Sequence, residues 1–359
     1  MIRWREVCLL LAVCACSGAC GRRAVQEPVW VQALRQELPA FEIRSLHPKQ
    51  ASCWSGHPSP DGKWLLCAHQ HMDKRGQRSP WEFHLRLCDA NAQLVRDVTR
   101  VRVFPWPQVE WSQTSDAFFF VDLNRRASLL KMDTRTNRVS RQTLPWVPGE
   151  RWGEPQVPVM SPTGGSYLLA VGDRPGRTGI YRVWLPSGKR RRLTEGTWPT
   201  WSPDGEWVAF VRPRGTPSVY RGEWWVVRGD GTGERPVIGE REKEQITKQR
   251  GGQTPQGWEG LYPSCWIGTR PGLVLVGGNY GSAEGVYAVD LNGGTANWVD
   301  LGPHAELELV SCSRDGRHLY VSVGEGPAGK RVFRLYLVEF VESGAETSAK
   351  RQQGPLARQ

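Results

Sequence analysis

One short phrase recurs four times along this chain and constrains its fold more than any other feature. Its copies begin at His57, Val159, Trp201 and Ser311, and each joins a short strand to a turn of the Ser-Pro-Asp-Gly kind and then to an apolar run. In such a turn the aspartate offers a local acceptor, the glycine tolerates positive φ, and the proline cannot continue a strand ladder. Each copy therefore predicts a β-hairpin. Hairpins repeated at roughly 40–50 residues predict the blades of a β-propeller.

Six units can be counted along the chain. Turn serines stand at Ser59, Ser112, Ser161, Ser202 and Ser313, and a degenerate fifth unit is centred on Trp266. Each unit has an apolar third strand, at residues 83–87, 128–132, 180–184, 223–227, 286–290 and 333–337. We therefore predict an all-β fold, a six-bladed β-propeller of four-stranded antiparallel blades over residues 41–341. A seventh blade would need a unit hidden in the insertion before Trp266.

The last unit lacks a strand that the chain supplies elsewhere. A clear third strand occupies residues 332–341, but residues 342–359 form a polar tail that is a poor fourth strand. The segment Phe41-Glu-Ile-Arg-Ser-Leu46 precedes the first blade and can serve as the missing outer strand. Such a clasp would pair the two ends of the chain and remove an exposed sheet edge.

The clearest unit also carries a resemblance to a known family. It runs from about Val183 to Arg228 and contains the phrase Trp201-Ser-Pro-Asp-Gly, an aromatic third strand, and a strand that ends Arg191-Arg-Leu-Thr194. In these features the chain resembles the WD40-like propeller repeat of the TolB propeller family, over about residues 50–341. The resemblance implies a propeller fold and a habit of binding, and it carries over no active site.

The amino terminus predicts export. Residues 1–19 combine a short basic region, an apolar run over residues 7–15 that is too short to span a membrane, and small residues before Cys20. A cysteine at the cleavage point is typical of bacterial lipoproteins, so we expect Cys20 to be lipidated, with Cys16 as the alternative. Residues 20–40 would then be a tether. We expect a cell-envelope protein on the periplasmic or extracellular face, or a secreted one if no lipid is attached.

The charge of the chain bears on its partners. The formal net charge is +11, which favours anionic partners. The arginines are scattered through every unit, however, as a compositional bias would place them, and the export signal disfavours nucleic acid. We expect an envelope protein or a glycan or peptide ligand as partner, membrane contact through the lipid anchor alone, and a monomer.

Five cysteines follow the signal, namely Cys53, Cys67, Cys88, Cys265 and Cys312. Cys67 and Cys88 are the closest pair in the predicted topology, and an exported protein can join them as a disulfide. Burial as small unpaired core side chains is the alternative. The odd count leaves one thiol free.

The sequence contains few signs of catalysis. It has no Gly-x-Ser-x-Gly elbow and no Cys-x-x-Cys zinc spacing. His69 and His71 alternate along a strand and share a face beside Asp73, but no third metal ligand accompanies them. We predict no catalytic residue, no metal and no cofactor. A carbohydrate-active lyase or hydrolase that uses the channel face is the alternative, because propeller lyases acting on uronic acid polymers carry histidines in the channel.

Tryptophans form the candidate binding site. They stand with proline in the segments that lead into successive blades, at Trp106, Trp146, Trp152, Trp198 and Trp258. Those segments converge on one propeller face, where aromatic rings can stack on sugars or grip a peptide. Packing of each ring between neighbouring blades is the alternative. The polar insertion at residues 240–260 is either a lid over this face or disordered. We therefore predict a non-catalytic protein-binding or ligand-binding scaffold.

Overall fold

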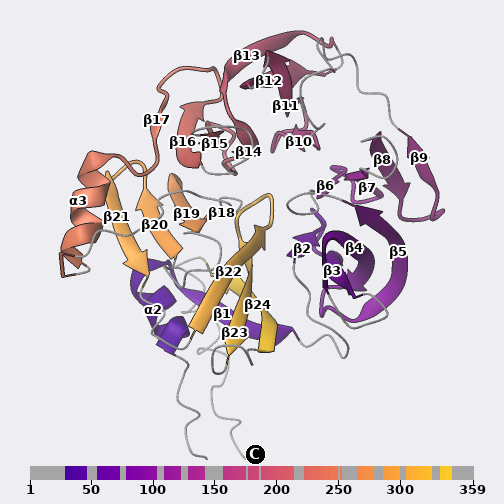
Figure 1. Ribbon diagram of the computed structural model, residues 1–359, viewed down its shortest axis with the longest axis horizontal. Coiled ribbons are helices and arrows are strands. Elements are labelled where there is room, and N and C mark those ends of the chain that lie inside the picture. The colour runs from indigo at the N-terminus through magenta and orange to yellow at the C-terminus, as the bar shows by residue number, and fades with distance from the viewer. Residues whose placement is uncertain are drawn as a thin grey trace, which may run out of the picture.

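The computed structural model describes residues 29–46, 55–72, 78–102, 109–122, 128–141, 157–174, 177–185, 187–213, 222–249, 251–252, 265–277, 286–299, 305–325 and 332–341. The strands form six antiparallel sheets of four strands each, arranged in a ring (Figure 1). The predicted six-bladed β-propeller is therefore confirmed. Two helices accompany the strands in the described part of the chain.

Five blades follow the chain without interruption, each from an inner strand to an outer one. Blade 1 contains β2 (Ser55–Pro58), β3 (Trp64–Met72), β4 (Arg78–Asp89) and β5 (Leu94–Arg102). Blade 2 contains β6 (Val109–Trp111), β7 (Ala117–Asp122), β8 (Ser128–Asp133) and β9 (Val139–Arg141). Blade 3 contains β10 (Val159–Met160), β11 (Ser166–Arg174), β12 (Arg177–Trp184) and β13 (Arg190–Glu195). Blade 4 contains β14 (Thr197–Trp201), β15 (Trp207–Pro213), β16 (Gly222–Arg228) and β17 (Arg235–Pro236). Blade 5 contains β18 (Cys265–Trp266), β19 (Leu273–Gly277), β20 (Val286–Asp290) and β21 (Thr295–Val299).

Blade 6 is built from both ends of the chain. It contains β22 (Ala305–Cys312), β23 (His318–Glu325) and β24 (Val332–Phe340), with β1 (Phe41–Leu46) as its outer strand. The pairing is antiparallel and runs from Phe41 opposite Phe340 to Leu46 opposite Leu335. Phe41 and Leu46 are buried, so the strand contributes to the core as well as to the sheet. The predicted clasp is confirmed.

The Ser-Pro-Asp-Gly turn of blade 4 explains why the repeat forms a hairpin. The Ser202 hydroxyl donates to Asp204 Oδ1 at 2.5 Å and accepts the backbone N–H of Trp207 at 2.8 Å. Asp204 in turn accepts the N–H of Glu206 at 2.9 Å, and Gly205 has a φ of +74°. The serine therefore bridges the two strands, while the aspartate and glycine hold the bend. The same bonds recur at Ser59 in blade 1 and at Ser313 in blade 6.

Both helices pack on the propeller. Helix α2 (Val29–Glu37) lies in the segment expected to be a tether, and its Trp30 and Leu34 are buried in the core between blades 5 and 6. Helix α3 (Glu240–Gln249) opens the insertion and lies along the outer strand β21, where Ile246 is buried and Gln249 accepts the N–H of Trp298 at 3.0 Å (Figure 1). This part of the insertion covers the rim of blade 5 and not the channel. Neither helix is long and apolar enough to cross a membrane, within the residues described.

Candidate functional site

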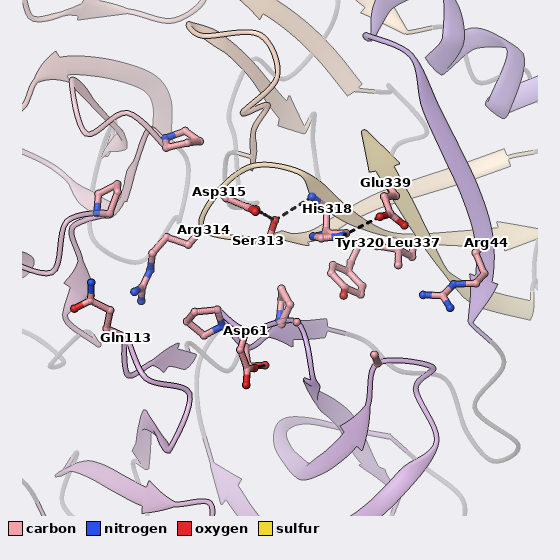
Figure 2. A pocket seen from close by; sticks show the side chains of 17 residues that line it. Arg44, Asp61, Gln113, Ser313, Arg314, Asp315, His318, Tyr320, Leu337 and Glu339 are labelled. Atoms are coloured by element: carbon pink, nitrogen blue, oxygen red, sulfur yellow. Dashed lines mark hydrogen bonds and ion pairs between the residues drawn. The ribbon is translucent and has the colours of Figure 1, made fainter. Parts of the chain in front are cut away.

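A groove opens on the face of the propeller where the Ser-Pro-Asp-Gly turns lie. Its volume is about 650 Å³. Turn residues of blades 1, 2, 3, 4 and 6 line the part near the axis, and β1, β23 and β24 of blade 6 line the part farther out (Figure 2). We call it the seam groove, and its polar lining includes Arg44, Asp61, Gln113, Arg314, His318 and Glu339.

Arg314 lies in the part of the seam groove near the axis. From the turn of blade 6 it reaches Glu110 of blade 2, with its Nη2 at 2.5 Å from Glu110 Oε1 and 3.0 Å from the Trp111 carbonyl oxygen. Glu110 also accepts the N–H of Met160 from blade 3 at 3.2 Å. Burial raises the pKa of Glu110, and the charge of Arg314 opposes that effect. A cavity of about 140 Å³ that both side chains line lies in the channel, and Arg314 lines this cavity as well as the groove.

The outer end of the seam groove carries a second arginine. Arg44 is exposed on β1 and donates from Nη1 to Asn91 Oδ1 at 2.8 Å, which ties blade 6 to blade 1. His318 Nε2 lies 3.7 Å from Glu339 Oε1 on the neighbouring strand. Tyr320 lines the wall below them, and burial raises its pKa to about 12. Figure 2 shows Arg44 on one side of the groove and Arg314 toward the other, where Gln113 also lies, with Asp61, His318 and Glu339 between the two arginines.

The middle of the seam groove is acidic and stiff. Burial opposes ionisation of Asp61, but hydrogen bonds from Ser59 and Lys63 lower its pKa, so it is charged at neutral pH. Asp315 accepts from Ser313 in the equivalent turn. Proline has a fixed φ, and four prolines stiffen the walls, namely Pro58 at the end of β2 and Pro60, Pro162 and Pro203 in the turns.

Of the predicted tryptophan rim, the structure describes one member. Trp198 lies on β14 at an irregularity of the strand pairing, with a φ of +51°, and its half-buried ring packs against the core between blades 4 and 5. Trp106, Trp146, Trp152 and Trp258 lie outside the described residues, as do Cys16 and Cys20. The predicted site lay in the segments between blades, and the seam groove was not predicted. The repeated turns were the available signal, because inner hairpins of successive blades all turn at the same end of a propeller.

Blade 1 contains the histidines and two of the cysteines for which the sequence predicted contacts. The predicted pair was His69 and His71 on one strand. In the structure His71 Nδ1 lies 2.8 Å from Nε2 of His84, which belongs to the neighbouring strand β4. No group of three or more histidine, cysteine or acidic side chains suited to a metal occurs among the described residues. The Cys67 and Cys88 thiols share a hydrogen bond. That bond and burial together raise the pKa of Cys88. Asp73 lies outside the described residues.

The strand pairing defines the class of this protein as a six-bladed β-propeller closed by its own amino-terminal strand. No family profile matches the sequence. Among solved structures with a similar architecture is TolB from Acinetobacter baumannii, with 15% identity over 80% of this chain and a TM-score of 0.42. The match covers 55% of that TolB chain, so this chain spans little more than half of its length.

Two enzymes are also among the similar structures. An oligogalacturonate lyase in complex with manganese matches at 16% identity, over 85% of this chain and 98% of its own, with a TM-score of 0.44. A gluconolactonase from Xanthomonas campestris matches at 15% identity, over 86% of this chain and 93% of its own, with a TM-score of 0.49. Each likeness concerns the propeller architecture. The chemistry of the site is therefore argued from the side chains of this chain.

Proposed function

We propose that this protein is a non-catalytic binding module of the cell envelope, and that its seam groove holds an extended peptide segment of a partner protein. The observation that carries this proposal is the arrangement of charge along the groove. Arg44 stands at the outer end and Arg314, paired with Glu110, stands near the axis, with Asp61, Asp315 and Glu339 between them. An extended segment with acidic ends and a basic centre is complementary to that pattern, and complementary charge favours specificity.

The shape and chemistry of the seam groove also favour binding over catalysis. Its walls are turns held by internal hydrogen bonds and by prolines, so little order is lost when a ligand enters. The carboxylates of the two turns accept hydrogen bonds within those turns, and Glu339 lies beside His318. These groups present fixed charges to a ligand.

The test is a binding survey with matched variants. The full chain is titrated, by fluorescence polarisation, against a panel of labelled peptides with different charge orders and a panel of envelope glycans. Arg44→Ala should weaken the best peptide at least tenfold, because Arg44 is exposed at one end of the groove. Arg192→Ala removes the same charge from an exposed position on β13 and should leave binding unchanged. Equal affinities for both variants, or binding to glycans alone, would contradict the proposal.

The envelope location rests on residues 1–20. A basic start, a short apolar run and Cys20 after small residues support export followed by lipid attachment. Mass spectrometry of the amino-terminal peptide from bacterial membranes should find a diacylglyceryl cysteine at position 20. Cys20→Ser should move the protein to the soluble fraction, whereas Cys16→Ser should not. The opposite result would assign the anchor to Cys16.

A second candidate is the carbohydrate-active lyase or hydrolase. The observation in its favour is Glu110, a carboxyl group whose pKa burial raises and which lines the channel cavity, as is typical of general acids. Its ion pair with Arg314 opposes this role, because the arginine stabilises the ionised carboxylate, which has no proton to donate. Pooled polyuronates and other envelope polysaccharides should be incubated with the protein and with Glu110→Gln. Product formed by the unsubstituted protein and lost in the variant would favour the enzyme.

A further inference from the structure

Two cysteines from neighbouring blades meet beside the central channel. Cys265 begins β18, the inner strand of blade 5, and Cys312 ends β22, the inner strand of blade 6. The Cys265 thiol donates a hydrogen bond to the Cys312 sulfur, which also accepts the backbone N–H of Trp266. Cys265 is fully buried, whereas Cys312 is half-buried and lines the channel cavity. One thiol of the pair is therefore open to a small molecule.

The backbones of the two blades are in direct contact next to this pair. The N–H of Gly268 donates to the carbonyl oxygen of Gly316 at 2.9 Å. A Cβ atom on Gly268 would stand 1.8 Å from the carbonyl oxygen of Asp315, so only glycine permits this approach. The contact holds blades 5 and 6 at a fixed separation beside the sulfurs. A disulfide needs such a fixed and short separation, because its geometry tolerates little deviation.

The environment makes the two thiols unequal. The hydrogen bond from Cys265 lowers the pKa of Cys312, burial opposes it, and the N–H of Trp266 adds to the lowering. The same thiol contact and burial raise the pKa of Cys265. Cys312 lines the channel cavity, whereas Cys265 is fully buried, so Cys312 is the thiol that a small disulfide meets first, and its thiolate is the nucleophilic form.

We propose that Cys312 and Cys265 form a reversible dithiol–disulfide couple that fastens blade 5 to blade 6. The Cys312 thiolate attacks one sulfur of a low-molecular-weight disulfide, a mixed disulfide forms, and one small thiolate leaves. That thiolate takes the proton of Cys265, whose thiolate then attacks the Cys312 sulfur and releases the second half of the small disulfide as a thiolate. The second thiolate takes up from water the proton that Cys312 lost on ionisation. The protein thiols lose two electrons and two protons, and the small disulfide is reduced to two thiols.

The other thiol pair provides a matched control within the same chain. Cys67 and Cys88 lie on neighbouring strands of one blade, β3 and β4, and both are buried in the core between blades 1 and 6. Their contact and burial raise the pKa of Cys88. We therefore expect this pair to stay reduced under conditions that oxidise the channel pair.

The test is oxidation of the full chain in its folded state. The protein is reduced, freed of reductant and exposed to oxidised glutathione at neutral pH, and its thiols are then alkylated in denaturant for peptide mapping. We expect a Cys265–Cys312 crosslink, with Cys67 and Cys88 alkylated. Cys265→Ser should accumulate glutathione on Cys312, and Cys312→Ser should leave Cys265 unmodified. The oxidised chain should melt about 5 °C above the reduced one, because the bond closes a loop of roughly 50 residues.

Two results would overturn the proposal. One is that Cys265 and Cys312 are both alkylated after native oxidation. The other is that the crosslink joins Cys67 to Cys88 and leaves the channel pair free. If the serine variants fail to fold, the mapping of the unsubstituted chain and its redox-dependent melting temperature decide between these outcomes.

Discussion

The interface between blades 3 and 4 is filled by large rings, whereas the seam between blades 1 and 6 leaves a groove. Arg182 of blade 3 lies over the rings of Trp184 and Trp201 at 5.1 Å each and donates to the carbonyl oxygen of Gly229 at 2.9 Å. Phe210 is fully buried in the same core. Stacking of a guanidinium on aromatic rings adds to the burial of apolar surface there.

The core of the seam is made of smaller side chains. Besides Tyr320 it contains aliphatic residues, Ala92 and the thiols of Cys67 and Cys88. It is joined by β1 and by hydrogen bonds such as that from Arg44 to Asn91. The difference teaches that aromatic rings and a stacked guanidinium fill the interface between blades 3 and 4, whereas smaller side chains and strand pairing join blades 1 and 6. The seam groove lies where the ring closes through strand pairing.

Removing the closing strand should have the largest effect on this comparison. Deletion of residues 40–47 removes the outer strand of blade 6 and the buried side chains of Phe41 and Leu46. Loss of two such side chains and of a sheet edge should cost on the order of 5 kcal/mol or more. Chemical denaturation measures this loss. Glu42→Ala, at an exposed position of the same strand, is the control and should change stability by less than about 0.5 kcal/mol. An unchanged melting temperature after the deletion would show that the ring closes in another way.

The packed interface should be the next most sensitive. Arg182→Ala removes two ring contacts and the hydrogen bond to Gly229, and it should cost about 2 kcal/mol. Arg192→Ala on the outer strand of the same blade should cost less than about 0.5 kcal/mol. Equal unfolding free energies for the two variants would mean that Arg182 adds nothing to the interface.

Blade 1 should respond to acid through its histidine pair, His71 and His84. Burial and the neighbouring His71, Arg86 and Arg100 lower the pKa of His84, an effect that Asp97 opposes. The folded state therefore binds a proton at His84 less readily than the unfolded state. Stability from this site is present above the usual histidine pKa of about 6.5 and is lost as pH falls below it. Melting temperatures from pH 7.5 to 5.0 should fall less steeply for His84→Gln than for the unsubstituted protein. Parallel curves would exclude the pair as the cause.

The smallest expected effect on stability is at the exposed end of the seam groove. Arg44→Ala removes a surface side chain bonded to Asn91 and should change the unfolding free energy by less than about 0.5 kcal/mol. Circular dichroism melts measure this. A large loss would make Arg44 a structural residue, and the weaker peptide binding expected of this variant would then need another explanation.

Much of the fold could be predicted because its determinants are local. The bonds of the turn at Ser202 join residues two to five positions apart, and the apolar strands follow directly. Closure of the ring by residues 41–46 could be predicted because the last unit lacks a fourth strand and would otherwise expose a sheet edge. The packing of helices α2 and α3 was not predicted, because it depends on which surface of blades 5 and 6 remains uncovered.

The sequence by itself determined the repeated hairpins, the number of blades and the strand that closes the ring, since each depends on neighbours in the chain or on the pairing of adjacent strands. Only the tertiary structure decided the seam groove, the Arg314–Glu110 ion pair and the Cys265–Cys312 contact. Arg314 and Glu110 are 204 residues apart in the sequence, and no spacing rule relates them. They meet because a propeller brings the inner strands and turns of all its blades to one axis, so side chains that belong to separate repeats become neighbours there.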